Sequence, residues 1–164
     1  MASRFKGGSR KKESDYYDEE AIEDVDDAIC EIKPLKEIKR LASRIRNRDR
    51  TEFSSTYWPP VHLAASFNDA AAIEMLIREL GFRADAIWTD AGNTTPAHEA
   101  VYEKSIDAFK TLLEFKPDLS MTAKVESYSG SVYDWISQME DDAAKKKFLK
   151  AVREGSTRQA KGRK

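Results

Sequence analysis

Three side chains have types that could carry chemistry: His62, His98 and Cys30. The two histidines are the only ones in the chain, and they are 36 residues apart. Each stands in a similar hexapeptide, PPVHLA from Pro59 and TPAHEA from Thr95. Histidine can ligate a metal, and a Cys–His pair can form a nucleophilic site. Because the histidines are placed alike, one explanation has to account for both.

The surroundings of Cys30 argue against a nucleophile or a metal centre. This cysteine lies in an acidic segment, and neighbouring carboxylates disfavour the thiolate. A single cysteine also excludes an internal disulfide and a multi-cysteine zinc site. We interpret Cys30 as a small, half-buried apolar residue.

The motifs that accompany common catalytic and cofactor sites are missing from the sequence. G-x-G-x-x-G, G-x-x-x-x-G-K-S/T, H-E-x-x-H and G-x-S-x-G do not occur. Asp141 and Asp142 are adjacent, so their carboxylates point in different directions, and we assign them to the start of the last helix. We therefore expect no catalytic residue, no cofactor and no bound metal.

The charges of the chain are strongly segregated. The 164 residues are enough for one domain with tails, and a net charge of -1 conceals the segregation. Ten acids and no Lys or Arg lie between Glu13 and Glu31, whereas nine bases and one acid lie between Lys145 and Lys164. Such blocks are typical of tails that are flexible or contact a partner. No run of 18 apolar residues is present, so we expect no membrane span.

The N-terminal third reads as an extension followed by one helix. Residues 1–33 are basic and then acidic, with a weak surface-lying helix over 13–32 and a flexible start over 1–12. After Pro34, apolar residues recur at helical spacing and predict an amphipathic capping helix over 34–50 with a basic outer side. The acidic segment could fold back onto this basic helix and neutralise it.

A self-similarity at a shift of 36 residues runs through the rest of the chain, from 56 to about 153. His62 maps to His98 and then to Asp134. Each unit reads as a turn, a short helix, a longer helix and a loop. Helix pairs of this size cannot bury their apolar faces alone, so they must stack on one another.

The unit resembles an ankyrin repeat. The signature T-P-L-H-x-A of that family appears as TPAHEA and PPVHLA, and DAGNTTP from Asp90 keeps its turn spacing with Asn93 in a glycine position. Asn tolerates a positive φ better than most residues. The segment AFKTLLEFKPDLS matches the second helix and its exit, and the third unit is degenerate, as a capping repeat should be.

This resemblance implies an all-α fold, an ankyrin-repeat solenoid of stacked helix-turn-helix units over 51–153 with an N-terminal capping helix and charged flexible tails. It also implies that His62 and His98 are structural and tie their rings to the backbone of the neighbouring turn, with Asp134 accepting similar hydrogen bonds in the third unit. Stacked repeats would hold the two histidines roughly 10 Å apart, too far to share an ion. We expect Trp135 to be buried in the core.

The same resemblance implies a non-catalytic adaptor or scaffold that binds another protein through its repeat face. Its contacts lie at turn tips and at the exposed end of the first helix, which here means Ser66, Phe67, Trp88, Thr89, Asp90, Ala91, Gly92, Tyr102 and Glu103. We favour partner contact for Phe67 and Tyr102, since aromatic residues dominate interface energetics. For Trp88, contact and packing against Phe82 stay equally open.

The basic tails allow an alternative function. Residues 154–164 continue the last helix as a solvated basic arm, and such arms bind nucleic acid, acidic protein surfaces or anionic lipid. The chain could then be a structural subunit of a larger, ribonucleoprotein-type assembly. We expect a cytoplasmic or nuclear location, and the basic start also leaves a short organellar presequence open.

Overall fold

The computed structural model describes residues 13–161, and most of these residues lie in helices. The predicted flexible start over 1–12 lies outside the described residues, as do residues 162–164. No helix in the described part of the chain is long and apolar enough to cross a membrane. The elements, in chain order, are α1 (Glu13–Cys30), α2 (Leu35–Ala42), β1 (Glu52–Phe53), α3 (Pro60–Ser66), α4 (Ala70–Glu74), a π-helical turn (Met75–Glu79), β2 (Ile87–Trp88), a 3-10 turn (Thr89–Ala91), α5 (Pro96–Tyr102), α6 (Ile106–Glu114), β3 (Ala123–Val125), β4 (Tyr128–Gly130), α7 (Val132–Gln138) and α8 (Asp142–Lys161).

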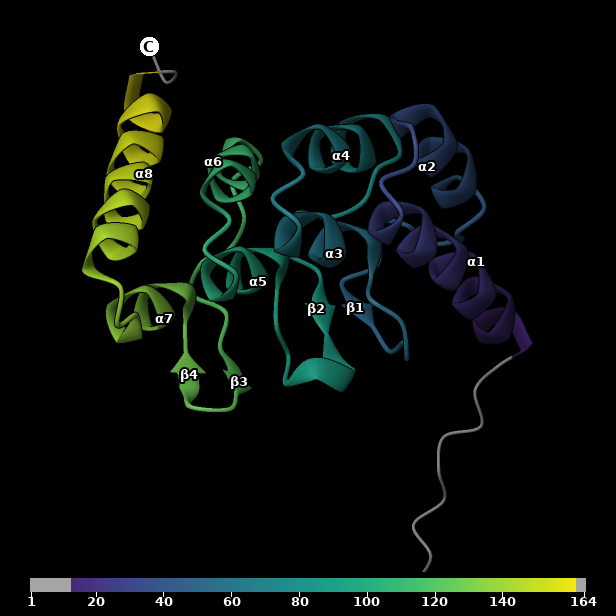
Figure 1. Cartoon of the computed structure of the whole chain (residues 1–164), viewed down its shortest axis with the longest axis horizontal. Coiled ribbons are helices and arrows are strands. Elements are labelled where there is room, and N and C mark those ends of the chain that lie inside the picture. Colours follow the sequence, from purple (N-terminus) through teal and green to yellow (C-terminus); the bar gives the residue numbers. More distant parts are fainter. Residues whose placement is uncertain (1–12, 162–164) are drawn as a thin grey trace, which may run out of the picture.

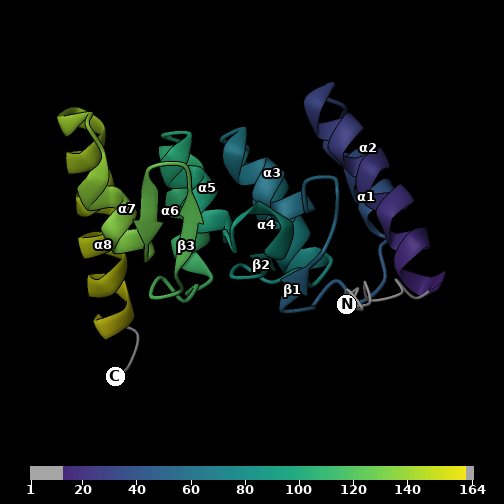
Figure 2. The same ribbon diagram turned by 90° about the horizontal axis from the view of Figure 1, so that it is seen from below.

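The helices lie in two rows (Figure 1). In one row α3 contacts α5 and α5 contacts α7, and in the other α4 contacts α6 and α6 contacts α8. Helices α1 and α2 extend the rows at one end, where α1 contacts α3 and α2 contacts α4. Figure 2 shows the same order of helix pairs from below. The core fills the space between the rows, and Trp135 lies in it with no exposed surface, as predicted.

The first-row helices begin at residues suited to a helix start. Pro60 and Pro96 stand in the first turn of α3 and α5, where the missing N–H would have had no helical partner. Thr95 before α5 and Ser131 before α7 each take part in a capping box with the residue three positions on. These local hydrogen bonds define where the helices start.

The turns between the helices of a pair also repeat. Asn68 follows α3 with φ 56°, and Lys104 follows α5 with φ 58°. In both cases the next amide donates to a carbonyl of the preceding helix, Asp69 to Ala64 at 2.9 Å and Ser105 to Ala100 at 2.8 Å. This is the Schellman arrangement, which ends a helix with one left-handed residue.

The predicted glycine-like position in the longer turn is confirmed, because Asn93 has φ 65°. Asn tolerates this region because its short polar side chain can bond locally. Asn93 therefore follows Gly92, at φ 70°, as a second left-handed residue in this turn.

The acidic segment is better ordered than the weak surface helix predicted for it. It forms α1 over Glu13–Cys30, and the helix buries Ala21, Ile22, Val25, Ala28 and Ile29. The basic segment is less helical than predicted, because α2 ends at Ala42 and turns follow instead of helix up to residue 50. The two segments do pack together, with an ion pair of 2.5 Å between Arg44 and Asp24 and a second between Arg50 and Asp18.

The C-terminal end and the strands also differ from the predictions. The tail predicted to begin at residue 154 is helical up to Lys161, since α8 continues without a break. Strand β1 pairs in parallel with β2, and β3 forms an antiparallel hairpin with β4. The hairpin lies in the loop between α6 and α7, where backbone groups outside a helix need other partners.

Candidate partner-binding surface

Both ring nitrogens of His98 have polar partners, and the Thr95 hydroxyl lies 2.9 Å from Nδ1. Its Nδ1 accepts a hydrogen bond from the Thr95 N–H at 3.2 Å, and its Nε2 donates to the carbonyl oxygen of Gly130 at 3.3 Å. Burial lowers the pKa of His98 to about 4, with the Gly130 carbonyl acting in the opposite direction. The imidazole is therefore neutral at pH 7 and links the start of α5 to the turn before α7.

His62 makes the same link one unit earlier, with one bond fewer. Its Nε2 donates to the carbonyl oxygen of Thr94 at 3.1 Å, and burial lowers its pKa to about 4. The residue before α3 is Pro59, which has no N–H, so nothing matches the Thr95 donor that His98 uses. Among the described residues, no group of three or more His, Cys, Asp or Glu is arranged to hold a metal ion.

Asp134 occupies the histidine position before the last helix pair and makes a local contact. Its Oδ2 accepts from the Ser131 N–H at 2.8 Å and from the Ser131 hydroxyl at 3.0 Å. The bond from the Ser131 backbone is the main cause that lowers the pKa of Asp134. The carboxylate thus reproduces the capping role of His98 through bonds to Ser131.

Cys30 is exposed and not half-buried as predicted, because α1 ends at this residue. Desolvation and then the hydrogen bond of the thiol to Asp26, 3.4 Å long, raise the pKa of Cys30. The carboxylates of Asp26, Asp27 and Glu31 raise it further. The predicted direction is confirmed, and the thiol is disfavoured as a nucleophile.

Two of the predicted partner residues lie where α3 ends. Phe67 follows α3 with 52 % of its surface exposed, an unusual state for a phenylalanine. Ser66 is half-buried, and its carbonyl oxygen accepts from the hydroxyl of Ser105 at 3.0 Å. That bond places the turn after α3 beside the turn after α5.

Tyr102 and Glu103 lie at the end of α5, next to the β3–β4 hairpin. Glu103 is exposed, and Tyr102 is half-buried with its hydroxyl 2.9 Å from a carboxylate oxygen of Glu126. The Tyr102 ring meets the Tyr128 ring edge-on, with centroids 5.6 Å apart. Sequence reasoning missed Glu126 and Tyr128 because it treated their segment as a loop. An aromatic residue inside a polar stretch was the available signal.

The four residues at the tip of the long turn remain at the surface but are held by internal bonds. Thr89, Asp90 and Gly92 are exposed, and Ala91 is half-buried. The Thr89 hydroxyl donates to the Phe53 carbonyl at 3.0 Å, and Asp90 accepts from the Ser54 hydroxyl at 3.2 Å.

Gly92 joins this tip to the hairpin. Its carbonyl oxygen accepts from the Lys124 N–H at 2.9 Å, and a Cβ atom at Gly92 would lie 2.0 Å from the Lys124 carbonyl oxygen. Only glycine allows this approach, at a φ of 70°. The tip over 89–92 and the hairpin thus form one continuous edge, at the bottom of Figure 1.

Trp88 is buried, which favours packing over partner contact, the two alternatives left open for it. Only 8 % of its surface is exposed, and its Nε1 donates to the Ser55 carbonyl oxygen at 3.0 Å. The indole packs against Trp58, with ring centroids 4.8 Å apart, and not against Phe82. The parallel pairing of β1 with β2 brings Trp88 close to Ser55 and Trp58. The predicted all-α fold contained no such pairing.

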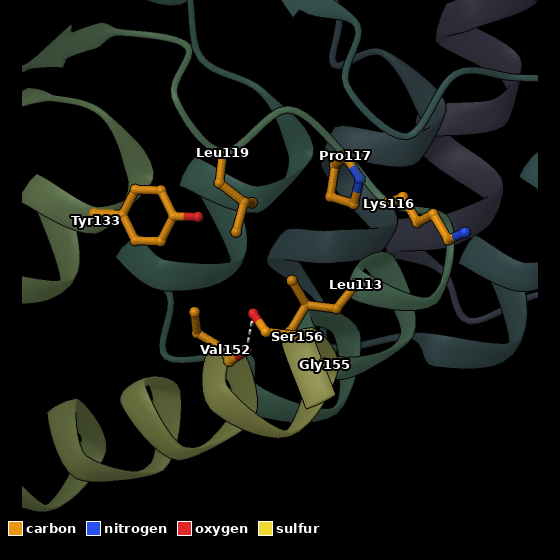
Figure 3. Close-up of a pocket in the computed structure, with 8 residues that line it drawn as sticks. All are labelled: Leu113, Lys116, Pro117, Leu119, Tyr133, Val152, Gly155 and Ser156. Carbon is orange, nitrogen blue, oxygen red and sulfur yellow. Dashed lines mark hydrogen bonds between the residues drawn. The ribbon is translucent and has the colours of Figure 1, made fainter. Parts of the chain in front are cut away.

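A small pocket opens on the other side of the molecule, between the end of α6, the loop after it and α8 (Figure 3). Its volume is about 180 Å³, and its walls include the apolar side chains of Leu113, Pro117, Leu119 and Val152. The Tyr133 hydroxyl points toward Leu119, while the Lys116 amine extends away from the pocket (Figure 3). The Ser156 hydroxyl, which also lines the pocket, donates to the Val152 carbonyl at 3.0 Å and so already has a partner.

Comparison with known proteins gives no relative on which to rely. A scan against protein-family models finds no match for the chain, and a search of curated proteins finds none either. Function is therefore argued from the geometry of the chain itself.

Proposed function

We propose that the chain is an ankyrin-type repeat protein that acts as a non-catalytic adaptor and binds another protein through the edge formed by its turns. The observation that carries the repeat assignment is a pair of equivalent bonds. His62 donates to the carbonyl of Thr94 and His98 to that of Gly130, and each acceptor lies in the turn before the next first-row helix. The resemblance to ankyrin repeats implies the same link from histidine to the backbone of the neighbouring turn.

The binding part of the proposal rests on aromatic groups at the surface. The exposed ring of Phe67 lacks the stabilisation that burial would give, which is about 1.5–3 kcal/mol for a phenylalanine. Tyr102 and Tyr128 add a half-buried aromatic pair with a polar rim of Glu103 and Glu126. Aromatic anchors with a polar rim are typical of protein–protein interfaces.

The test is capture of a partner from the source lysate by the intact protein, with variants that separate the proposed surface from the rest. We expect Phe67→Ala and Tyr102→Ala to lose the partner. Tyr133→Ala is the matched control, because Tyr133 is half exposed but lies on α7 beside the pocket. The captured protein should persist after nuclease treatment and at high salt.

Equal capture by all three variants would contradict the proposed surface. Loss of the partner on nuclease or salt treatment would move the function to the basic residues. Circular dichroism of each variant checks that the helices are unchanged.

A further inference from the structure

One side of α8, together with a neighbouring residue of α6, presents a row of cations. Lys147, Lys150, Arg158 and Lys161 fall on the same side of α8 because their separations of three and eleven residues are close to whole helical turns. Two adjoining grooves mark this side, and Glu154 lines both. One of these grooves is lined by Lys147 and Lys150 of α8 and by Lys110 of α6. We call Lys110, Lys147, Lys150, Arg158 and Lys161 the basic face.

The cations of the basic face are almost free of acidic partners. Within the part of the chain that the structure describes, only Lys150 has a carboxylate within 4.0 Å, that of Glu154 at 3.8 Å. Elsewhere many cations are paired, as in Arg44 with Asp24 at 2.5 Å and Lys104 with Asp141 at 3.3 Å. The charge of the basic face is therefore available to an external anion.

We propose that the basic face binds the phosphate backbone of a double-stranded nucleic acid. The basic face is separate from the edge formed by residues 89–92 and the β3–β4 hairpin. The proposal for the basic face does not depend on the protein partner proposed for that edge. Five cations against one acid leave a surplus of positive charge, and polyanion binding gains from the release of condensed counterions. Helix α8 is continuous to Lys161 and therefore holds the cations in a row, which a solvated arm would not do.

The spacing along α8 favours a duplex. Lys147 and Lys150 form one cluster and Arg158 and Lys161 a second, and their midpoints are about 16 Å apart at 1.5 Å per residue. The major groove of B-DNA is about 12 Å wide, so flexible side chains from the two clusters can reach the phosphates on both of its sides. Glu154 lies between the clusters and would face the open groove instead of a phosphate.

Two alternatives fit the basic face less well. Single strands are usually held by stacking their bases on aromatic side chains, and the linings of both grooves contain none. An acidic protein segment would gain from a wide apolar floor, whereas Ile106 and Ala151 are the only apolar residues that line the grooves.

The experiment measures binding of the full chain to a fluorescein-labelled DNA duplex of two helical turns by anisotropy, over a range of salt concentrations. Five phosphate contacts predict a slope of log K against log[salt] of about −4.5. Lys147→Gln with Lys150→Gln should reduce the magnitude of this slope by about 2 and weaken binding by tens of fold at ~0.1 M salt.

A matched pair at the other end of the molecule controls for net charge. Lys36 and Arg40 are exposed, lie one turn apart on α2, and have no carboxylate within 4.0 Å among the described residues. Lys36→Gln with Arg40→Gln removes the same charge as the test pair but should leave affinity and slope nearly unchanged. Helix content of both double variants is compared by circular dichroism.

Equal effects of the two double variants would overturn the proposal, because the binding would then follow net charge alone. Undiminished binding by the Lys147 and Lys150 variant would overturn it as well. Tighter binding to the labelled single strand or to a poly-glutamate peptide than to the duplex would replace the proposed ligand with that class.

Discussion

The Nε2 atom of His98 lies 3.3 Å from the carbonyl oxygen of Gly130, so a single side chain connects the start of α5 with the turn before α7. Its Nδ1 is at the same time the acceptor for the Thr95 N–H. Both ring nitrogens are used, and the ring also meets Trp135 edge-on at a centroid distance of 4.7 Å.

Replacement of His98 by alanine should lower the free energy of unfolding by about 3 kcal/mol. The change leaves a cavity and removes two hydrogen bonds of buried groups. Asp134→Ala is the control at the equivalent position, where the carboxylate is exposed and only caps α7, so its loss should cost clearly less. Urea unfolding measures both, and similar losses for the two variants would contradict the structural role of the His98 bridge.

The stability of the protein should fall on mild acidification. Burial lowers the pKa of both His62 and His98 from 6.5 to about 4. Below pH 6.5 the unfolded chain takes up protons that the folded chain refuses, so stability decreases as the pH falls toward about 4. We expect the midpoint of urea unfolding to drop between pH 7 and pH 4, and to drop less in His98→Asn. A drop in His98→Asn as large as in the unmodified chain would show that the His98 ring is not buried as a neutral group.

Glu99 should have the opposite pH dependence. Only 6 % of its surface is exposed, and burial raises its pKa from 4.5 to about 7. The folded state favours the neutral acid, so its contribution is present below pH 4.5 and is lost as the pH rises through about 7. Glu99→Gln should therefore stabilise the protein at pH 8 and have little effect at pH 5. Thermal unfolding at the two pH values tests this, and a gain of the same size at both would speak against the buried carboxyl.

Gly92 should tolerate alanine much less well than Gly81 does. Both have a positive φ, 70° for Gly92 and 79° for Gly81, so alanine costs about 1 kcal/mol at each for the backbone alone. At Gly92 the new Cβ would also lie 2.0 Å from the Lys124 carbonyl oxygen, whereas at Gly81 nothing lies within 4 Å. The difference between the two variants in free energy of unfolding isolates the clash. Equal values would mean that the tip and the hairpin are not in contact.

Local features of the fold could be predicted because they depend on residues a few positions apart. The start of α5 follows from Thr95, Pro96 and His98, and the left-handed turn follows from Asn93. The burial of Trp135 was also expected, because the resemblance to ankyrin repeats places it at a core position. The partner surface at Phe67 and Tyr102 stays a prediction.

Features that depend on distant parts of the chain were missed. The buried carboxyl of Glu99 was not predicted, and the hairpin of Glu126 and Tyr128 was predicted as a loop. The segment 154–161 looked like a solvated arm because its composition is basic, yet it continues a helix that packs on α6.

The sequence by itself determined where first-row helices start and where left-handed turns occur. Caps, prolines and left-handed residues act within about one helical turn. It also determined the segregation of acids and bases. The tertiary structure decided the burial of side chains whose partners are distant in the sequence. Trp88 is buried because the Ser55 carbonyl and the Trp58 ring come from the segment that follows β1, far from Trp88 in the sequence. The basic face exists because α6 brings Lys110 beside Lys147 and Lys150. Burial and charge pairing are properties of elements meeting in space, and sequence spacing does not encode that meeting directly.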